Sequence, residues 1–272
     1  MQKFSLFPVS MLLSFWAHRH LIFSLTRREI LGRYRGSFLG IFWSFINPVL
    51  MLAVYTFVFS IIFKARWGSG DGSRTEFALV LFAGLMVFNL FAECINRSAT
   101  IILSNVNFVK KVIFPLEILP LVTLGSACFH FIISLSVWLL AYFVIFGLPH
   151  ITILIFPVVL LPLFILTLGL SFIFASLGVY LRDLPQLLSI ITTVLMFLTP
   201  IFFPLSSIPL AYRFYLNFNP LTSVVEMSRD VLYFGKMPDL IELLVRLIVS
   251  LLIVFLGFAF FQKTRKGFSD VL

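Results

Sequence analysis

The sequence predicts an all-α polytopic membrane protein with six transmembrane helices. Hydrophobic residues make up 61% of the 272 residues and charged residues only 11%, whereas an average soluble domain is about 25% charged. The mean hydropathy is +1.10, and 35 residues are Phe. A chain of this size has no interior large enough to bury so much apolar surface. We therefore expect a bilayer to act as its solvent.

Six apolar stretches have the length of a membrane span, which needs about 20 mostly apolar residues. The first and third contain no acidic or basic residue apart from one histidine. "GLPH" (147–150) separates the third from the fourth, and "RDLP" (182–185) separates the fourth from the fifth. Within a single transmembrane domain (1–272), the predicted spans are 38–63, 77–103, 118–146, 151–181, 187–203 and 240–261.

An even number of spans places both ends of the chain on one side of the membrane. Thirteen of the 20 Lys and Arg residues then lie on the side of the termini, and seven on the other side. Cytoplasmic segments of membrane proteins are enriched in Lys and Arg. Both termini, including the tail 262–272, are therefore expected to be cytoplasmic.

The segment 10–35 is expected to be an amphipathic interface helix on the cytoplasmic surface of the membrane. It carries five arginines, which are too costly for the hydrocarbon centre. A short helix packed on a partner is the alternative. Apolar residues recur between the charges at roughly helical spacing, as a surface helix requires: Leu12, Phe15, Trp16, Ile22, Phe23 and Ile30.

The stretch "NVNFVKKVIFPLEILP" (105–120) places a charged pair between the second and third spans. Lys110 and Lys111 interrupt the apolar run, and Pro115 disfavours helix at the residue before it. We expect a short helix over 105–114 at the membrane edge, about 15 Å long. Its role as a coupling or gate helix competes with that of a simple basic turn that fixes the topology.

The segment 205–235 is expected to hold two short helices on the outer side. Asn219 is a good N-cap, Pro220 suits the first helical position, and Gly235 suits the residue after the end. The helices are too short to cross, so we expect them to enter the outer leaflet and return. An ordinary structured loop is the alternative.

Polar residues inside the predicted first two spans are candidates for function. Glu93 is an acid well inside the second span, where a carboxylate is a functional hypothesis by default. Arg97 lies four residues further on, so a structural ion pair is an equal alternative. In the first span, Asn47 needs a hydrogen-bond partner. Aromatic residues accompany it, and we interpret the following set as channel-lining candidates: Phe42, Trp43, Asn47, Tyr55 and Phe59.

Several function classes are disfavoured. Gly235-Lys236 lacks the flanking residues of a phosphate-binding P-loop. Two of the four histidines lie on the basic surface segment and the other two are far apart in sequence, so no metal site is predicted. Cys94 and Cys128 lie in apolar runs and suggest buried free thiols. The net charge of +9 borders apolar spans, which indicates membrane flanks and no nucleic-acid partner.

Five stretches in a fixed order resemble those of a known family. They are "RRE…GRYRGSFLGIFWSFINP" (27–48), "NVNFVKKVIFPLEILP" (105–120), "YLRDLPQLLSIITTVLMFLTPIFFP" (180–204), "NPLTSVVEMSRDVLYFG" (219–235) and "KGFSDVL" (266–272). The chain resembles ABC-2 type polysaccharide-exporter permeases over essentially its whole length. O-antigen exporter permeases (Wzm-type) are most similar, and capsule and teichoic-acid exporter permeases are also similar.

The resemblance implies a homodimer in the bacterial inner membrane above two separate ATP-binding cassette subunits. ATP and Mg would bind to those subunits, so no cofactor is expected in this chain. The dimer would carry a lipid-linked polysaccharide into the periplasm through a channel between the protomers. Contact with the ATPase is expected of the coupling or gate residues, which are Lys110, Lys111, Phe114, Pro115, Glu117, Arg182 and Asp183.

The pyrophosphate of a lipid carrier would need cationic partners at the cytoplasmic entrance. Arginine suits this role because its guanidinium contacts phosphate oxygens in pairs. Our candidates are Arg27, Arg28, Arg33 and Arg35, with anchoring to the inner leaflet as the alternative. Two other functions stay open, namely an ABC-2 permease for drugs or lipids and a membrane-embedded transferase acting on polyprenyl-linked sugars.

Overall fold

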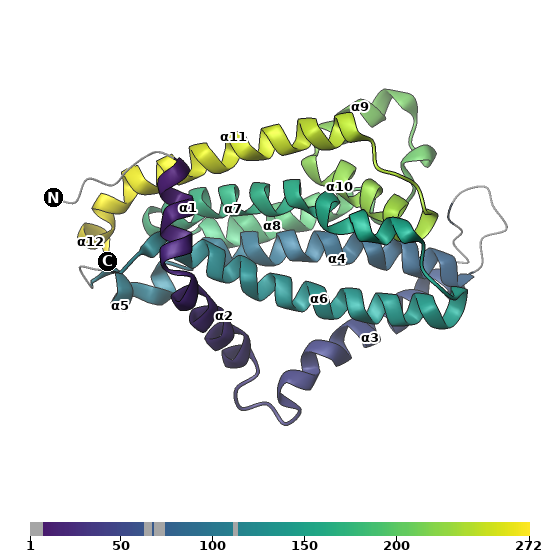
Figure 1. The fold of residues 1–272 in the computed structure, drawn as a ribbon, viewed down its shortest axis with the longest axis horizontal. Helices are drawn as coiled ribbons and strands as arrows, with labels where there is room; N and C mark the ends of the chain where they lie inside the picture. Colours follow the sequence, from purple (N-terminus) through teal and green to yellow (C-terminus); the bar gives the residue numbers. More distant parts are fainter. Residues whose placement is uncertain (1–7, 63–66, 68–73, 111–113) are drawn as a thin grey trace.

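The computed structural model describes residues 8–62, 67, 74–110 and 114–272, and these residues fold into one elongated bundle of helices (Figure 1). Helix α1 and the C-terminal helix α12 lie at the same end of the bundle. The α-helices are α1 Pro8–Ala17, α2 Arg19–Arg33, α3 Trp43–Tyr55, α4 Arg74–Ser98, α5 Val106–Val109, α6 Leu119–Phe146, α7 Phe156–Tyr180, α8 Leu184–Leu198, α9 Leu210–Phe218, α10 Pro220–Arg229, α11 Leu240–Thr264 and α12 Phe268–Val271.

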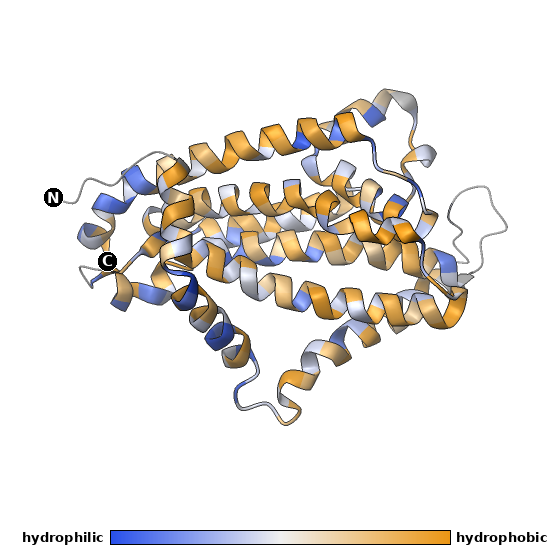
Figure 2. Cartoon of the chain, viewed as in Figure 1, coloured by the Kyte–Doolittle hydropathy of each residue, from blue (hydrophilic) through white to orange (hydrophobic). Residues whose placement is uncertain are grey.

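Shorter helical turns join these helices. They are the 3-10 turns η1 Gly40–Phe42, η3 Leu103–Asn105, η4 Leu116–Ile118, η5 Ile151–Ile155, η6 Leu205–Ser207 and η8 Arg265–Gly267, and the π-helical turns η2 Thr56–Ile62 and η7 Asp230–Phe234. Apolar residues run along the long helices, while hydrophilic residues gather on α2 and near the termini (Figure 2).

Within the described residues, five helices are long and apolar enough to cross a membrane. They lie within Gly40–Phe59, Thr75–Ser98, Leu116–Phe146, Ile151–Tyr180 and Leu240–Val271, and a shorter apolar helix spans Leu184–Leu198. The all-α polytopic fold class is therefore confirmed. Helix α4 is the centre of the bundle, since 83% of its apolar window is buried against the other helices.

Several helices begin or end at other residues than the predicted spans. Phe38 precedes the helical part of the first span, which begins at Gly40. The second span was predicted over 77–103, whereas α4 covers Arg74–Ser98 and a turn follows it. The fifth was predicted over 187–203, whereas α8 covers Leu184–Leu198. Helix α8 starts early because Pro185 tolerates the first turn of a helix, where its missing N–H has no partner to lose.

Glycines bring the helices α7 and α11 into close contact. A Cβ added at Gly169 would meet the backbone nitrogen of Val254 at 2.7 Å, and one added at Gly257 would meet the carbonyl of Gly169. A Cβ at Gly178 would likewise collide with the carbonyl oxygen of Ala99, beyond the end of α4. Small residues let backbones approach where lipid provides no hydrophobic drive between helices.

The predicted continuous interface helix over 10–35 is two helices, which is a correction. Helix α1 ends at Ala17, and α2 begins at Arg19 and runs in a different direction (Figure 1). His18 between them has φ −102° and ψ 17°, outside the helical values. Leu12 and Trp16 on α1 are 63% and 72% exposed, so α1 presents an apolar outer face.

The predicted helix over 105–114 is also shorter than expected. Helix α5 ends at Val109, and residues 111–113, including Lys111, lie outside the described residues. The rings of Phe108 and Phe114 stack with their centroids 4.2 Å apart. Residues six apart on a straight helix point to different sides. Phe108 and Phe114 therefore do not lie on one straight helix.

The helix punctuation of the segment 205–235 is confirmed. The Asn219 side chain accepts a hydrogen bond from the backbone nitrogen of Leu221 at 3.0 Å, as an N-cap does. Gly235 ends η7 with φ 64°, a left-handed value that suits glycine. Helices α9 and α10 lie toward the end of the bundle away from the termini (Figure 1).

Candidate functional site

A network of charged side chains joins helices α2, α4 and α6. Glu93 of α4 accepts from Arg33 Nη1 at 2.6 Å and lies 3.4 Å from Arg97 Nη1. The predicted Glu93–Arg97 pair therefore exists, but the closer partner comes from a helix sixty residues earlier. Arg97 also pairs with Glu29 of α2. Glu93 thus takes part in a link between helices, which sequence spacing did not reveal.

His130 of α6 completes this network. Its Nδ1 lies 3.0 Å from Arg33 Nη1 and 3.4 Å from a Glu93 oxygen. The imidazole therefore contacts both members of the ion pair between α2 and α4. Within that pair, the charges of Arg33 and Glu93 offset each other.

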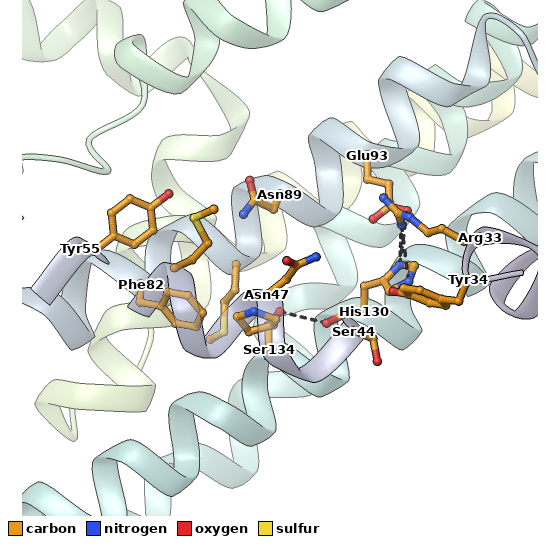
Figure 3. A pocket seen from close by; sticks show the side chains of 13 residues that line it. Arg33, Tyr34, Ser44, Asn47, Tyr55, Phe82, Asn89, Glu93, His130 and Ser134 are labelled. Carbon is orange, nitrogen blue, oxygen red and sulfur yellow. Dashed lines mark hydrogen bonds and ion pairs between the residues drawn. The ribbon is translucent and has the colours of Figure 1, made fainter. Parts of the chain in front are cut away.

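A cleft of about 240 Å³ opens next to the network, between α3 on one side and α4 and α6 on the other (Figure 3). Arg33, Glu93 and His130 lie at one end, and Tyr55 and Phe82 lie at the other. Its lining consists of Arg33, Tyr34, Ser44, Asn47, Pro48, Met51, Tyr55, Phe82, Met86, Asn89, Glu93, His130 and Ser134.

The middle of the cleft carries neutral polar groups. Between Thr75 and Ser98, Asn89 is the one exposed residue of the otherwise buried α4, and it faces the cleft with Asn47 of α3 (Figure 3). Neither carboxamide forms a hydrogen bond to a residue that the structure describes. The hydroxyl of Ser134 donates to the His130 carbonyl of its own helix and can still accept.

The structure separates the five predicted channel-lining residues. Asn47 and Tyr55 line the cleft, whereas Phe42 and Trp43 are exposed at the start of the first span, outside it. Phe59 stacks on other rings instead, with centroid distances of 5.6 Å to Phe77 and 6.0 Å to Phe202. Sequence reasoning missed four further lining residues on later helices, namely Phe82, Met86, Asn89 and Ser134.

The four arginines proposed for a pyrophosphate lie in two places: Arg33 is apart from the other three, of which Arg35 follows the end of α2. Arg27, Arg28 and Arg35 line a separate groove of about 550 Å³ together with Phe23 and Leu31, among other residues. Arg28 also stands over the ring of Phe108, 5.6 Å from its centroid. Arg33 instead faces the cleft and Glu93. The groove is therefore the place where several guanidinium groups can meet one anion.

Glu117 of η4 links its own segment to α1 and to η8 near the C-terminus. It is only 9% exposed and accepts from Arg265 Nη1 at 2.5 Å and from the Ser14 hydroxyl at 2.8 Å. Arg265 also donates to the Phe114 carbonyl at 2.8 Å. Of the other proposed coupling residues, Pro115 is half-buried just before Glu117, and Lys110, Arg182 and Asp183 are exposed.

Arg229 is a buried cation that sequence reasoning assigned only to the outer loop. Its guanidinium, 1% exposed, donates to the carbonyl oxygens of Val80 (3.1 Å), Pro200 (2.5 Å) and Ile201 (2.7 Å). It also pairs with Glu226 at 2.8 Å. Burial lowers the pKa of Arg229 to about 10, and Glu226 opposes that shift. The residue stays charged at neutral pH and joins α10, α4 and the chain after α8.

Comparisons with known proteins give a consistent result. The family model described as ABC-2 type transporter matches residues 20–233. The chain is 29% identical to the O-antigen export system permease protein RfbA of Myxococcus xanthus, over 94% of this chain and 96% of that protein. Identity to RfbA of Klebsiella pneumoniae is 26%, over 93% and 95%. The polysialic acid transport protein KpsM of Escherichia coli is 28% identical, over 90% and 93%.

Proposed function

The chain belongs to the ABC-2 type transporter family, and we propose that it is the permease subunit of an ABC exporter that moves lipid-linked O-antigen polysaccharide out of the cytoplasm. One observation carries this proposal. Proteins named as O-antigen export permeases match the chain at 26–29% identity over at least 93% of its length. The apolar helices of the described bundle make it a multi-pass membrane protein.

We propose that two copies of the chain form the transport channel, and that two ATP-binding cassette subunits bind ATP and Mg and drive it. The absence of a P-loop motif in the sequence supports hydrolysis by a separate chain. Lys110, Arg182 and Asp183 are exposed and suit contact with those subunits. Glu117 is tied to Arg265 and Ser14, so its part is to hold the contact region together.

The orientation follows from the same assignment. We place the protein in the bacterial inner membrane with both termini in the cytoplasm. Helices α1 and α12 lie at one end of the bundle (Figure 1), and most of the basic residues fall on the side of the termini in the predicted topology. Helices α9 and α10 then lie toward the periplasm, where they would border the exit of the channel.

The groove on α2 suits the pyrophosphate of the lipid carrier. Arg27, Arg28 and Arg35 offer several hydrogen-bond donors each, in a fork that matches phosphate oxygens. Phe23 and Leu31 offer apolar surface next to those charges. This combination fits a ligand that joins an anionic linkage to an isoprenoid chain.

A capsular polysaccharide is the second candidate cargo, because the similarity to the polysialic acid transport protein KpsM covers 90% of the chain. Teichoic acid is a third candidate cargo. A different and less favoured function is that of a transferase for polyprenyl-linked sugars. The transferase role would require Glu93, Asp183 or His130 to perform bond formation. Glu93 and His130 are engaged with Arg33, which favours a structural role for both.

Reconstitution with the candidate ATPase tests the proposal. Proteoliposomes that hold both subunits should hydrolyse ATP faster when a lipid-linked glycan is added than when the unlinked lipid is added. Neutral and sialylated glycans added in parallel separate O-antigen from capsule. Covalent extension of the glycan by the purified chain, with no export, would contradict the transporter proposal and support the transferase.

A further inference from the structure

We propose that the cleft between α3, α4 and α6 binds one neutral sugar ring of the transported polymer, and that Asn47 and Asn89 determine which ring it accepts. The inference rests on the proposed function and adds a subsite within each protomer, apart from a channel between protomers. It starts from two polar side chains that, among the described residues, lack a hydrogen-bond partner in apolar surroundings. Two carboxamides face open space in an apolar bundle without a hydrogen bond to any described residue.

The polar groups of the cleft match sugar hydroxyls. Each carboxamide has two N–H donors and an oxygen with two acceptor sites, and a sugar hydroxyl both donates and accepts. Ser134 adds an acceptor, because its own proton goes to the His130 carbonyl. A polar group at this depth is costly unless a partner satisfies it. A polyhydroxylated ring supplies several such partners at once.

The two ends of the cleft narrow the class of ligand. Tyr55 and Phe82 offer aromatic surface on which the C–H face of a sugar can pack. At the other end, Arg33 and Glu93 pair at 2.6 Å, so their charges offset each other. A carboxylate on the sugar would face Glu93 without a free cation to balance it. The cleft therefore favours a neutral ring over an acidic one.

The size of the cleft limits the ligand to a small part of a polymer. Its volume of about 240 Å³ lies below the range of about 300–1,000 Å³ that is usual for pockets of drug-sized ligands. It has room for one ring and not for a folded chain. Such a subsite would contact successive sugars briefly as the polymer advances, which suits recognition without tight retention.

Two serines of α6 give a matched test. Ser134 lines the cleft, whereas Ser136 is exposed two positions further on, about 200° around the helix. Both hydroxyls donate to the carbonyl four residues earlier, at 3.0 Å and 2.8 Å. The variants Ser134→Cys and Ser136→Cys, assembled with the ATPase in nanodiscs, are labelled with a small maleimide. The unsubstituted chain measures the background from Cys94 and Cys128.

The labelling rate is measured with a carrier lipid that bears two neutral hexoses, with the same lipid bearing no sugar, and with a version that ends in sialic acid. We expect the neutral glycan alone to slow the labelling of Ser134→Cys at least fivefold and to leave Ser136→Cys unchanged. Equal protection by the sugar-free lipid would overturn the proposal in favour of a lipid headgroup site. Equal protection by the sialylated glycan would overturn the preference for a neutral ring.

A second pair of variants tests the two carboxamides. In Asn89→Leu and Asn47→Leu, about ten times more neutral glycan should be needed for half-maximal stimulation of the ATPase, whereas the sugar-free lipid should act as on the unsubstituted complex. Gel filtration of each complex verifies assembly. If the unsubstituted complex does not respond to any glycan, the proposed function itself fails. If it responds, but the glycan does not slow the labelling of Ser134→Cys and the two Asn variants respond as the unsubstituted complex does, the subsite alone is refuted.

Discussion

Replacing Arg229 by methionine tests whether one buried guanidinium holds together the α9–α10 end of the bundle. The Arg229 side chain is 1% exposed and donates to the carbonyl oxygens of Val80, Pro200 and Ile201. Those three residues lie on α4 and in the turn after α8. Methionine fills much of the same space without donors, so the change separates the hydrogen bonds from the packing.

The expected cost follows from the groups that would lose their donor. A buried polar group without a partner costs about 1–3 kcal/mol, and the loss of one member of a buried ion pair costs about 3–5 kcal/mol. Glu226 is 32% exposed and can turn to water, so the carbonyl groups carry most of the cost. Three carbonyl groups would cost about 3–9 kcal/mol, and we expect Arg229→Met to lower the free energy of unfolding by about 3–5 kcal/mol, the lower part of that range. Arg229→Lys should lose about half as much, because an ammonium donates from a single point.

Equilibrium unfolding of the purified chain in mixed micelles, followed by near-ultraviolet circular dichroism, measures this free energy. Arg213→Met is the matched control. Arg213 of α9 also donates to two carbonyl oxygens, Ser206 at 2.7 Å and Ile208 at 2.8 Å, but both lie in the short segment directly before its own helix. We expect the control to cost less than about 1 kcal/mol. If Arg229→Met costs no more than this control, Arg229 does not hold the three segments together.

Three further substitutions test other parts of the fold. Gly178→Ala should prevent assembly, because its Cβ would collide with a backbone carbonyl, whereas Gly32→Ala, with open space around it, should give a normal gel-filtration profile. Glu117→Gln should weaken its link to Arg265 and speed hydrogen exchange at the C-terminus, and unchanged exchange would contradict the link. Lys110→Glu should separate ATP hydrolysis from export in proteoliposomes while the dimer stays intact, and unchanged export would refute its coupling role.

The parts of the fold that follow local rules could be predicted from the sequence. Apolar length identified the spans, because a bilayer imposes nearly the same length on every crossing helix. Asn219 and Gly235 marked the ends of a helical segment, because an N-cap oxygen and a left-handed backbone are local requirements. Such features depend on a few neighbouring residues, and Asn219 and Gly235 have the roles that the sequence predicted.

Contacts between distant segments could not be predicted in the same way. Spacing suggested Arg97 as the partner of Glu93, but the closer Arg33 comes from a helix whose position depends on the whole bundle. The stacking of Phe108 on Phe114 was missed because a contact between two rings six residues apart is not expected on one helix. Asn89 looked like one polar residue in a buried span, and only the packing of α3 shows that it faces a cleft.

The ion pair between Arg33 and Glu93 bears on how α2 would contact the proposed lipid-linked glycan. The ion pair with Arg33 is a weak source of stability but fixes the rotation of α2 against α4 and α6. That rotation turns Arg27 toward the groove and Arg33 toward the cleft. The two positions are six residues apart, about 9 Å along the helix axis. In a lipid-linked glycan, the anionic linkage directly precedes the first sugars. A helix with a cationic groove on one face and a neutral polar cleft on another, separated by this short distance, is suited to contact both parts of such a molecule.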